Sequence, residues 1–149
     1  MIGVRKAVPE DAVLIVEFQL SMAMETEQLV LDPGVVDRGV RAVFDNPALG
    51  CYYVAEQNGE VIGSLMTTYE WSDWRNGTVL WIQSVFVLPR FRRLGVYTGM
   101  YRFLKEMVLG DSGLRGIRLY ADHSNLPAHQ VYLNLGMRGD HYRMFEWMK

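Results

Sequence analysis

Residues 85–95 decide the fold, and they read VFVLPRFRRLG. Residues 85–87 are β-branched or aromatic, which favours a strand. Pro89 ends this strand, because a proline nitrogen cannot donate to a β-ladder. A basic loop follows, and after Gly95 the apolar residues recur with the spacing of a helix that runs to about Leu109. The stretch therefore predicts a strand, a basic loop and a helix in that order.

The loop and the start of the helix suit an anion. The first backbone N–H groups of a helix lack partners within it, and the helix dipole adds positive charge there. Arg92 and Arg93 add guanidinium groups, which bind phosphate well. Gly95 has no Cβ, so the backbone can approach a bulky diphosphate. A solvated basic loop before an ordinary helix has the same local pattern, so this stretch alone does not identify a ligand.

Three strands are predicted before the basic loop. Residues 51–57 and 60–71 flank Asn58-Gly59, a pair that favours the type I′ turn of a tight hairpin. Residues 78–88 form the third strand, after a turn at Asn76-Gly77. Consecutive strands joined by short turns predict an antiparallel meander.

The N-terminal third is predicted to be mostly helical. A short strand at residues 2–7 comes first. Pro9 opens a helix, because proline fits the first helical turn. A second helix follows Asp32-Pro33 and runs to about Asp45, where Asn46-Pro47 stops it.

The C-terminal part adds a parallel strand. Residues 115–121 have a strand pattern, and the order strand–helix–strand predicts parallel pairing with residues 78–88. Asn125 is placed to cap a further helix and Gly136 to end it, and residues 137–148 favour one or two final strands. The predicted fold class is α/β: a mixed sheet, in which an antiparallel meander joins a parallel strand pair, with about four helices.

Composition narrows the function. The chain has 149 residues, 50% of them hydrophobic, which predicts one domain over residues 1–149. The formal net charge of −2 argues against a general nucleic-acid binder. Cys51 is the only cysteine, which suits a reducing compartment, and no stretch has the roughly 18 apolar residues of a membrane span. We expect a cytoplasmic protein with no nucleic-acid or membrane partner. His123, His129 and His141 lack the spacing of a metal site.

A second pattern lies on the predicted C-terminal helix. Asn125 would cap the helix, and Ala128 and Tyr132 follow at the spacing of one helical face, before Gly136. Alone, this describes a capped helix with a core tyrosine. Together with residues 85–95, it resembles the GNAT superfamily of acyl-CoA N-acyltransferases.

The family's diphosphate motif is Gln/Arg-x-x-Gly-x-Gly/Ala. Arg92 and Gly95 match its first two fixed positions. Tyr97 occupies the third, where a small residue is usual. The resemblance is carried by residues 51–137, and before them only the order of elements matches.

The resemblance implies acetyl-CoA as co-substrate. Free backbone groups of the strand before the basic loop would hold the pantetheine arm, and one N–H would steady the oxyanion formed when an amine attacks the thioester. Tyr132 would be the general acid toward the departing sulfur, since a phenol with a pKa of roughly 10 stays protonated at neutral pH. The implied cofactor-binding residues are Val85, Phe86, Val87, Arg92, Arg93, Leu94, Gly95, Val96, Tyr97, Thr98, Asn125 and Ala128.

The residue that accepts the amine's proton is left open by the family pattern. Many members carry a glutamate where this chain has Gln83, which cannot act as a base. Glu70 is the best substitute, acting directly or through water. The other reading of Glu70 is a solvent-facing carboxylate at the end of a strand.

Two acidic segments indicate a small cationic amine as the acceptor. Carboxylates beside tryptophans suit an ammonium group through charge and cation–π contact. A solvated helix end and an ordinary turn would have the same composition. The expected substrate-binding residues are Glu25, Glu27, Trp71, Asp73 and Gln83.

These observations predict an N-acetyltransferase that moves acetyl from acetyl-CoA to a primary amine. The alternative is a non-catalytic module that binds or senses acyl-CoA, and Gln83 and Tyr97 favour it. A nucleic-acid binder using Arg90, Arg92 and Arg93 is a third class, against which the net charge weighs. The resemblance also implies that the chain can form a homodimer.

Overall fold

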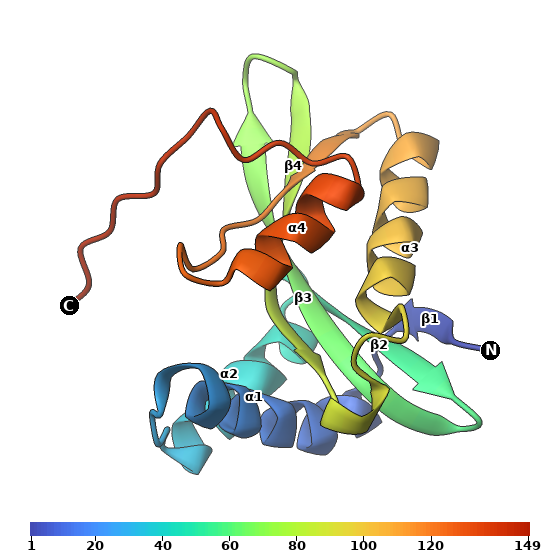
Figure 1. Cartoon of the computed structure of the whole chain (residues 1–149), viewed down its shortest axis with the longest axis vertical. Helices are drawn as coiled ribbons and strands as arrows, with labels where there is room; N and C mark the ends of the chain where they lie inside the picture. The colour runs from blue at the N-terminus through green and yellow to red at the C-terminus, as the bar shows by residue number, and fades with distance from the viewer. The chain divides into compact units, whose positions relative to one another are not determined.

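The computed structural model describes residues 1–149. It divides into two compact units, Met1–Arg118 and Leu119–Lys149, and each is described by itself. Figure 1 shows the elements. The strands are β1 (Gly3–Lys6), β2 (Cys51–Gln57), β3 (Glu60–Ser72), β4 (Gly77–Val87) and β5 (Leu114–Arg118), and the helices are α1 (Ala12–Glu27), α2 (Pro33–Asp45), α3 (Val96–Gly110) and α4 (Leu126–Asn134), with short 3₁₀ helices η1 (Pro9–Asp11) and η2 (Pro89–Phe91).

The sheet of the first unit has five strands in the order β1-β2-β3-β4-β5. β1 to β4 pair antiparallel in sequence order, and β5 pairs with β4 in parallel. The predicted fold class, a meander joined to a parallel pair with four α-helices, is confirmed.

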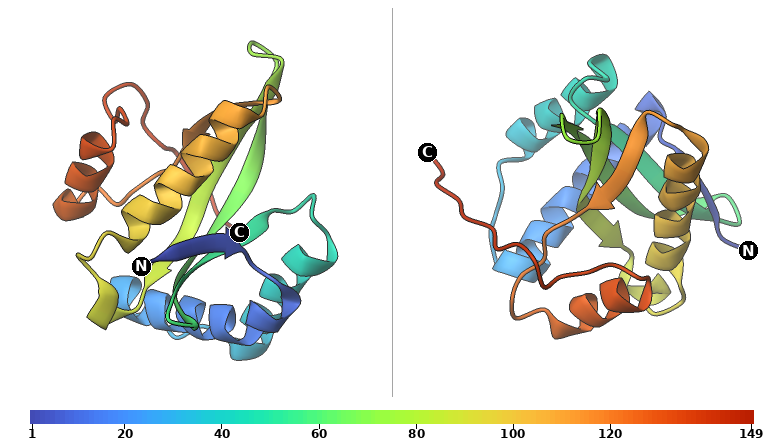
Figure 2. Two further views of the ribbon diagram at one scale, coloured as in Figure 1. Left: turned by 90° about the vertical axis from the view of Figure 1, so that its right-hand side faces the viewer. Right: turned by 90° about the horizontal axis from the view of Figure 1, so that it is seen from above.

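Helices cover both faces of this sheet (Figure 2). Tyr52 and Tyr53 are neighbours on β2, so their side chains point to opposite faces. Tyr52 stacks on Phe44 of α2, with ring centroids 5.7 Å apart. Tyr53 packs against Phe103 of α3 at the same centroid distance. Ile15 of α1 belongs to the same buried cluster as Tyr52, so α1 and α2 share one face and α3 covers the other.

Local signals explain where the elements begin and end. Asn58 and Gly59 both have positive φ, 51° and 79°, as a type I′ turn requires, and they join β2 to β3. The Asp32 side chain accepts hydrogen bonds from the backbone N–H groups of Gly34 and Val35, at 2.8 and 3.2 Å, and so caps α2.

The second unit contains α4. The Asn125 side chain accepts a hydrogen bond from the Ala128 backbone N–H at 3.2 Å, which confirms it as the N-cap. Gly136, with a φ of 88°, lies just after the helix, and the N–H of Met137 bonds the carbonyl of Tyr132 at 3.0 Å. The prediction of a single domain over residues 1–149 stays a prediction.

Two strand predictions need correction. β5 ends at Arg118 rather than at residue 121, because its ladder with β4 stops at that residue. No strand forms over residues 137–148, so the predicted final strands are wrong. The aromatic residues Tyr142, Phe145 and Trp147 favour extended backbone, but a strand also needs a paired neighbour, and no ladder includes this stretch. No helix of the chain has the length and apolar character needed to cross a membrane.

Candidate functional site

One edge of β4 loses its neighbouring strand halfway along. The parallel pairing of β4 with β5 ends at the pair Trp81–Arg118, so residues 82–87 have no strand beside them on that side. The Leu88 N–H bonds the Ile62 carbonyl of β3 at 2.9 Å. Since backbone groups alternate in direction along a strand, the Val87 carbonyl points away from β3, to the open edge.

A β-bulge interrupts β4 on this same stretch. Gln83 pairs with Met66 and Phe86 pairs with Ser64, so β4 has one more residue than β3 between the two pairs. Ser84, inside the bulge, has a φ of 55°, which is uncommon for a residue other than glycine. Bulges beside functional sites change the direction of the strand and its side chains, and no local sequence pattern predicts this one.

The basic loop leads into α3 through a left-handed residue. Gly95 is the N-cap, with φ 81° and ψ 14°, and its carbonyl accepts the first helical bond from Gly99 at 2.9 Å. The backbone N–H groups of residues 96–98 come before this first bond, as at any helix start. A Cβ at Gly95 would meet no atom within 4 Å, so the space over the helix start is open. Arg93 and Leu94 are exposed beside it.

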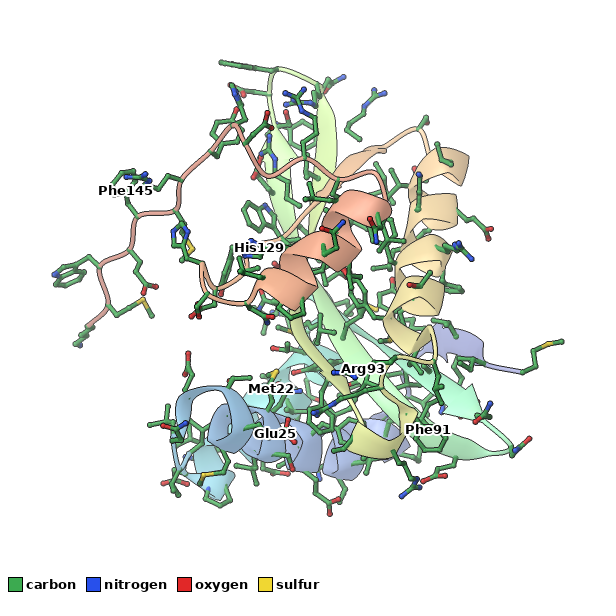
Figure 3. The ribbon with its side chains drawn as sticks, viewed as in Figure 1. Met22, Glu25, Phe91, Arg93, His129 and Phe145 are labelled. Atoms are coloured by element: carbon green, nitrogen blue, oxygen red, sulfur yellow. The ribbon has the colours of Figure 1, made fainter.

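A cavity of about 300 Å³ lies at the C-terminal end of β4. It brings together two groups of predicted site residues, Glu25 of α1 on one side and residues 85–87 and Arg92 on the other. Met22 and Thr26 also line it, one helical turn apart on α1, and neither was predicted as a site residue. In Figure 3, Met22 and Glu25 come from α1 and Arg93 from the loop before α3.

Arg92 is held in place by three contacts around this cavity. Its Nε donates to the Val87 carbonyl at 2.8 Å, and its Nη2 to Glu25 Oε2 at 2.7 Å. Its guanidinium carbon lies 5.4 Å from the centroid of the Phe86 ring, within cation–π range. The residue predicted to bind phosphate thus contacts the cavity's backbone edge and a residue predicted to bind the acceptor.

Glu70 joins three strands near the point where β5 ends. Its Oε1 accepts from Trp81 Nε1 at 2.9 Å, and its Oε2 pairs with Arg118 Nη1 at 2.6 Å. The hydrogen bond from Trp81, helped by Arg118, holds the pKa of the Glu70 carboxyl below its usual range. Trp81 and Arg118 are also the last paired residues of β4 and β5, so this contact holds the two strands together where they separate.

The predicted acceptor residues on β3 and the following turn lie far from the cavity. Trp71 pairs with Thr78 of β4, and at about 3.3 Å per residue Thr78 is ~23 Å along the strand from Val85. Asp73 lies beyond Trp71, in the turn. Glu70, opposite residue 79, is ~20 Å from Val85 by the same measure. The structure does not bring these three residues together with Glu25.

The other predicted site residues lie outside the cavity lining, and their contacts are as follows. Gln83, on β4, accepts a hydrogen bond from Thr68 at 3.3 Å. Glu27 is the last residue of α1 and is exposed. Tyr132 lies on α4, and burial raises the pKa of its phenol, so it stays protonated at neutral pH. No group of His, Cys, Asp or Glu side chains is arranged to hold a metal ion.

The parallel strand pair separates halfway along β4, and the basic loop leads from β4 into a helix N-terminus, as the resemblance implied. The family model "Acetyltransferase (GNAT) family" matches residues 21–137. The chain belongs to the GNAT acetyltransferase family.

Solved structures and curated relatives agree with this family. A crystal structure of a possible acetyltransferase from Clostridium difficile 630 is 37% identical, with a TM-score of 0.92 over 100% of this chain and 98% of that one. An uncharacterized N-acetyltransferase of Methanocaldococcus jannaschii is 31% identical over 59% of this chain and 53% of its own length. An N-alpha-acetyltransferase of Sulfurisphaera tokodaii is 30% identical over 58% and 56%. The chain spans about half the length of these two curated relatives.

Replacing Glu70 with Gln should lower stability in a pH-dependent way. The folded-state pKa of Glu70 is lowered, so its contribution is present above its ordinary value of 4.5 and is lost as the pH falls through the folded-state pKa. Because water reaches both partners of the pair, we expect a loss at pH 7 of no more than about 1 kcal/mol. Urea unfolding at pH 7 and at pH 3 measures it.

The control for this prediction is Glu106→Gln, which removes one negative charge from an exposed position on α3. The Glu70 variant should be less stable than the Glu106 variant at pH 7, and the difference should become smaller at pH 3. An equal stability of the two variants at both pH values would show that the contact between Glu70 and Arg118 does not stabilise the fold.

Proposed function

We propose that the chain is an N-acetyltransferase that moves acetyl from acetyl-CoA to a primary amine. The observation that carries the proposal is the open edge of β4, residues 82–87, which leads through the basic loop into the start of α3. An extended chain of amides can pair with an open strand edge, and a diphosphate suits a helix N-terminus. Coenzyme A has both parts, because its pantetheine arm contains two amides and is joined to a diphosphate.

The residues present fit this molecule. The open edge offers backbone groups of residues 85–87 for the pantetheine arm, except the Val87 carbonyl, which accepts from Arg92. The bulge at Ser84 changes the direction of the backbone N–H groups beside the place expected for the thioester. Arg92, Arg93 and the first N–H groups of α3 would hold the diphosphate, and the open space at Gly95 leaves room for it. Asn125 and Ala128 of α4 are proposed to complete the cofactor site.

Tyr132 is the proposed general acid. When an amine attacks the thioester carbon, the C–S bond breaks and the sulfur leaves with the electron pair of that bond, so a proton or a hydrogen bond at sulfur assists the step. The raised pKa of Tyr132 supports this role, because the phenol keeps its proton at the pH of the reaction.

The acceptor is proposed to be a small cationic amine. Glu25 at the cavity and Glu27 at the end of α1 would attract an ammonium group and repel an acid. Trp71 and Asp73 would contact only an acceptor long enough to reach the β3–β4 turn. The proposal of a cationic acceptor therefore depends on Glu25 and Glu27 of α1 alone.

The test is thiol release from acetyl-CoA with a panel of amines, with the acetylated product identified by mass. The panel contains spermidine, an aminoglycoside, a peptide with a free N-terminus, glycinamide and glutamate. The proposal expects turnover with a cationic member and little with glutamate. Preference for glutamate would contradict the electrostatic assignment, and coenzyme A binding without turnover on any amine would favour a non-catalytic binding module.

Glu70 is proposed to receive the proton of the acceptor through water, although its contacts with Trp81 and Arg118 lower the pKa of its carboxyl and so make it a weaker base. A distance of ~20 Å along the strand is too long for direct transfer. Glu70→Gln should then lower the rate most near neutral pH and recover at high pH, where the free amine is abundant. A pH–rate profile of unchanged shape would mean that bulk water accepts the proton, and that Glu70 only contacts Trp81 and Arg118.

A further inference from the structure

The pair Glu25–Arg92 spans the cavity. Glu25 is on α1 and Arg92 is in the loop between β4 and α3, 67 residues later. Their side chains form an ion pair at 2.7 Å, and both line the same cavity as residues 85–87. The sequence predicted different ligands for these two residues, the cofactor for Arg92 and the acceptor for Glu25. In the structure they bind each other.

This ion pair can exchange partners. The Arg92 and Glu25 side chains are 41% and 40% exposed, so water reaches both, and such pairs are weak. The diphosphate of coenzyme A carries two negative charges against one on a carboxylate, and it can accept two parallel hydrogen bonds from one guanidinium, so it competes well for an arginine. Arg92 would keep its bond to the Val87 carbonyl, because that bond uses Nε and the pair uses Nη2.

We propose that a phosphate of coenzyme A replaces the Glu25 carboxylate as the partner of Arg92. Glu25 then becomes available to the acceptor only after this exchange. The inference rests on the proposed function, because it names the group that draws Arg92 away. Its consequence is an order of binding. Without coenzyme A, Arg92 neutralises the carboxylate that would attract a cationic amine. With coenzyme A bound, the carboxylate faces the cavity without its guanidinium partner.

Calorimetry with coenzyme A tests the exchange. Glu25→Gln removes the competitor for Arg92, so coenzyme A should bind about two- to fivefold more tightly than to the wild type, the range expected for an exposed ion pair. Glu17→Gln is the matched control, because it removes one negative charge from an exposed position of the same helix. Its effect should be small, since exposed charges at a distance are screened by salt.

A double-mutant cycle distinguishes the exchange of partners at Arg92 from direct repulsion between Glu25 and the phosphates of coenzyme A. In the background of Arg92→Ala, Glu25→Gln should change the affinity for coenzyme A no more than Glu17→Gln does. The carboxyl carbon resonance of Glu25 should also move when coenzyme A is added to the wild type, and it should not move in Arg92→Ala. This readout reports on the carboxylate itself and does not need turnover.

Different results would overturn the proposed function and the proposed exchange. If the wild type does not bind coenzyme A, the proposed function fails, and the exchange fails with it. If the wild type binds coenzyme A, but Glu25→Gln and Glu17→Gln have equal affinities and the Glu25 resonance stays in place, the exchange alone is overturned.

Discussion

Gly95→Asp should weaken the binding of coenzyme A by on the order of 10²-fold. A carboxylate about 5 Å from a phosphate, at the effective dielectric of a protein surface, costs roughly 3 kcal/mol per unit of phosphate charge. The variant should still fold. The φ of 81° at Gly95 is tolerated better by Asp than by most residues, a Cβ there meets no atom within 4 Å, and Asp is a favourable N-cap. Isothermal titration calorimetry measures the loss.

Gly95→Asn is the matched control, because it adds the same bulk at the same φ without the charge. We expect the Asn variant to bind coenzyme A much more tightly than the Asp variant. Equal affinities of the two variants would mean that bulk, and not the charge of the diphosphate, matters at Gly95. Wild-type affinity in both would place the diphosphate elsewhere on the chain.

Tyr132→Phe should lower turnover by roughly 10²- to 10⁴-fold, the usual worth of general acid catalysis. Phenylalanine keeps the ring and its packing and removes only the hydroxyl that donates to the leaving sulfur. The affinity for coenzyme A should stay nearly unchanged, because diphosphate binding is assigned to the loop before α3 and to the start of that helix. Single-turnover thiol release measures the chemical step.

The control for this prediction is Tyr142→Phe, which removes a hydroxyl from an exposed tyrosine of the same unit, outside any helix or strand. It should turn over like the wild type. A Tyr132 variant with the turnover of the Tyr142 variant, under conditions in which chemistry limits the rate, would remove Tyr132 from the mechanism.

Local signals predicted most of the fold. Asn58-Gly59 fixed the β2–β3 hairpin, and residues 51–57 form the predicted strand with the predicted bounds. Asp32-Pro33 set the start of α2, and Asn125 set that of α4. Each of these signals acts within a few residues, through a φ angle or a side chain that caps the next turn. The prediction failed at residues 137–148, because the strand preference of aromatic residues gives no information on whether a partner strand exists.

The site was harder to predict, because its contacts join distant parts of the chain. Arg92 meets Glu25 across 67 residues, and Glu70 meets Arg118 across 48. The resemblance identified the strand, the loop and the helix start, but not these pairs. The extra residue at Ser84 changes the register against β3, and no local pattern specifies it. The sequence also predicted that Trp71 and Glu25 lie in one acceptor site, although the length of the strand between them separates them.

The most direct test of the coenzyme A groove is amide hydrogen exchange with and without coenzyme A. We propose that the pantetheine arm lies along the open edge of β4 and the diphosphate at the start of α3. Saturating coenzyme A should therefore slow exchange in residues 83–87 and 95–98 and leave β1 and β2 unchanged. Slowing confined to other segments, or no slowing in those two at a concentration that saturates binding, would contradict the claim.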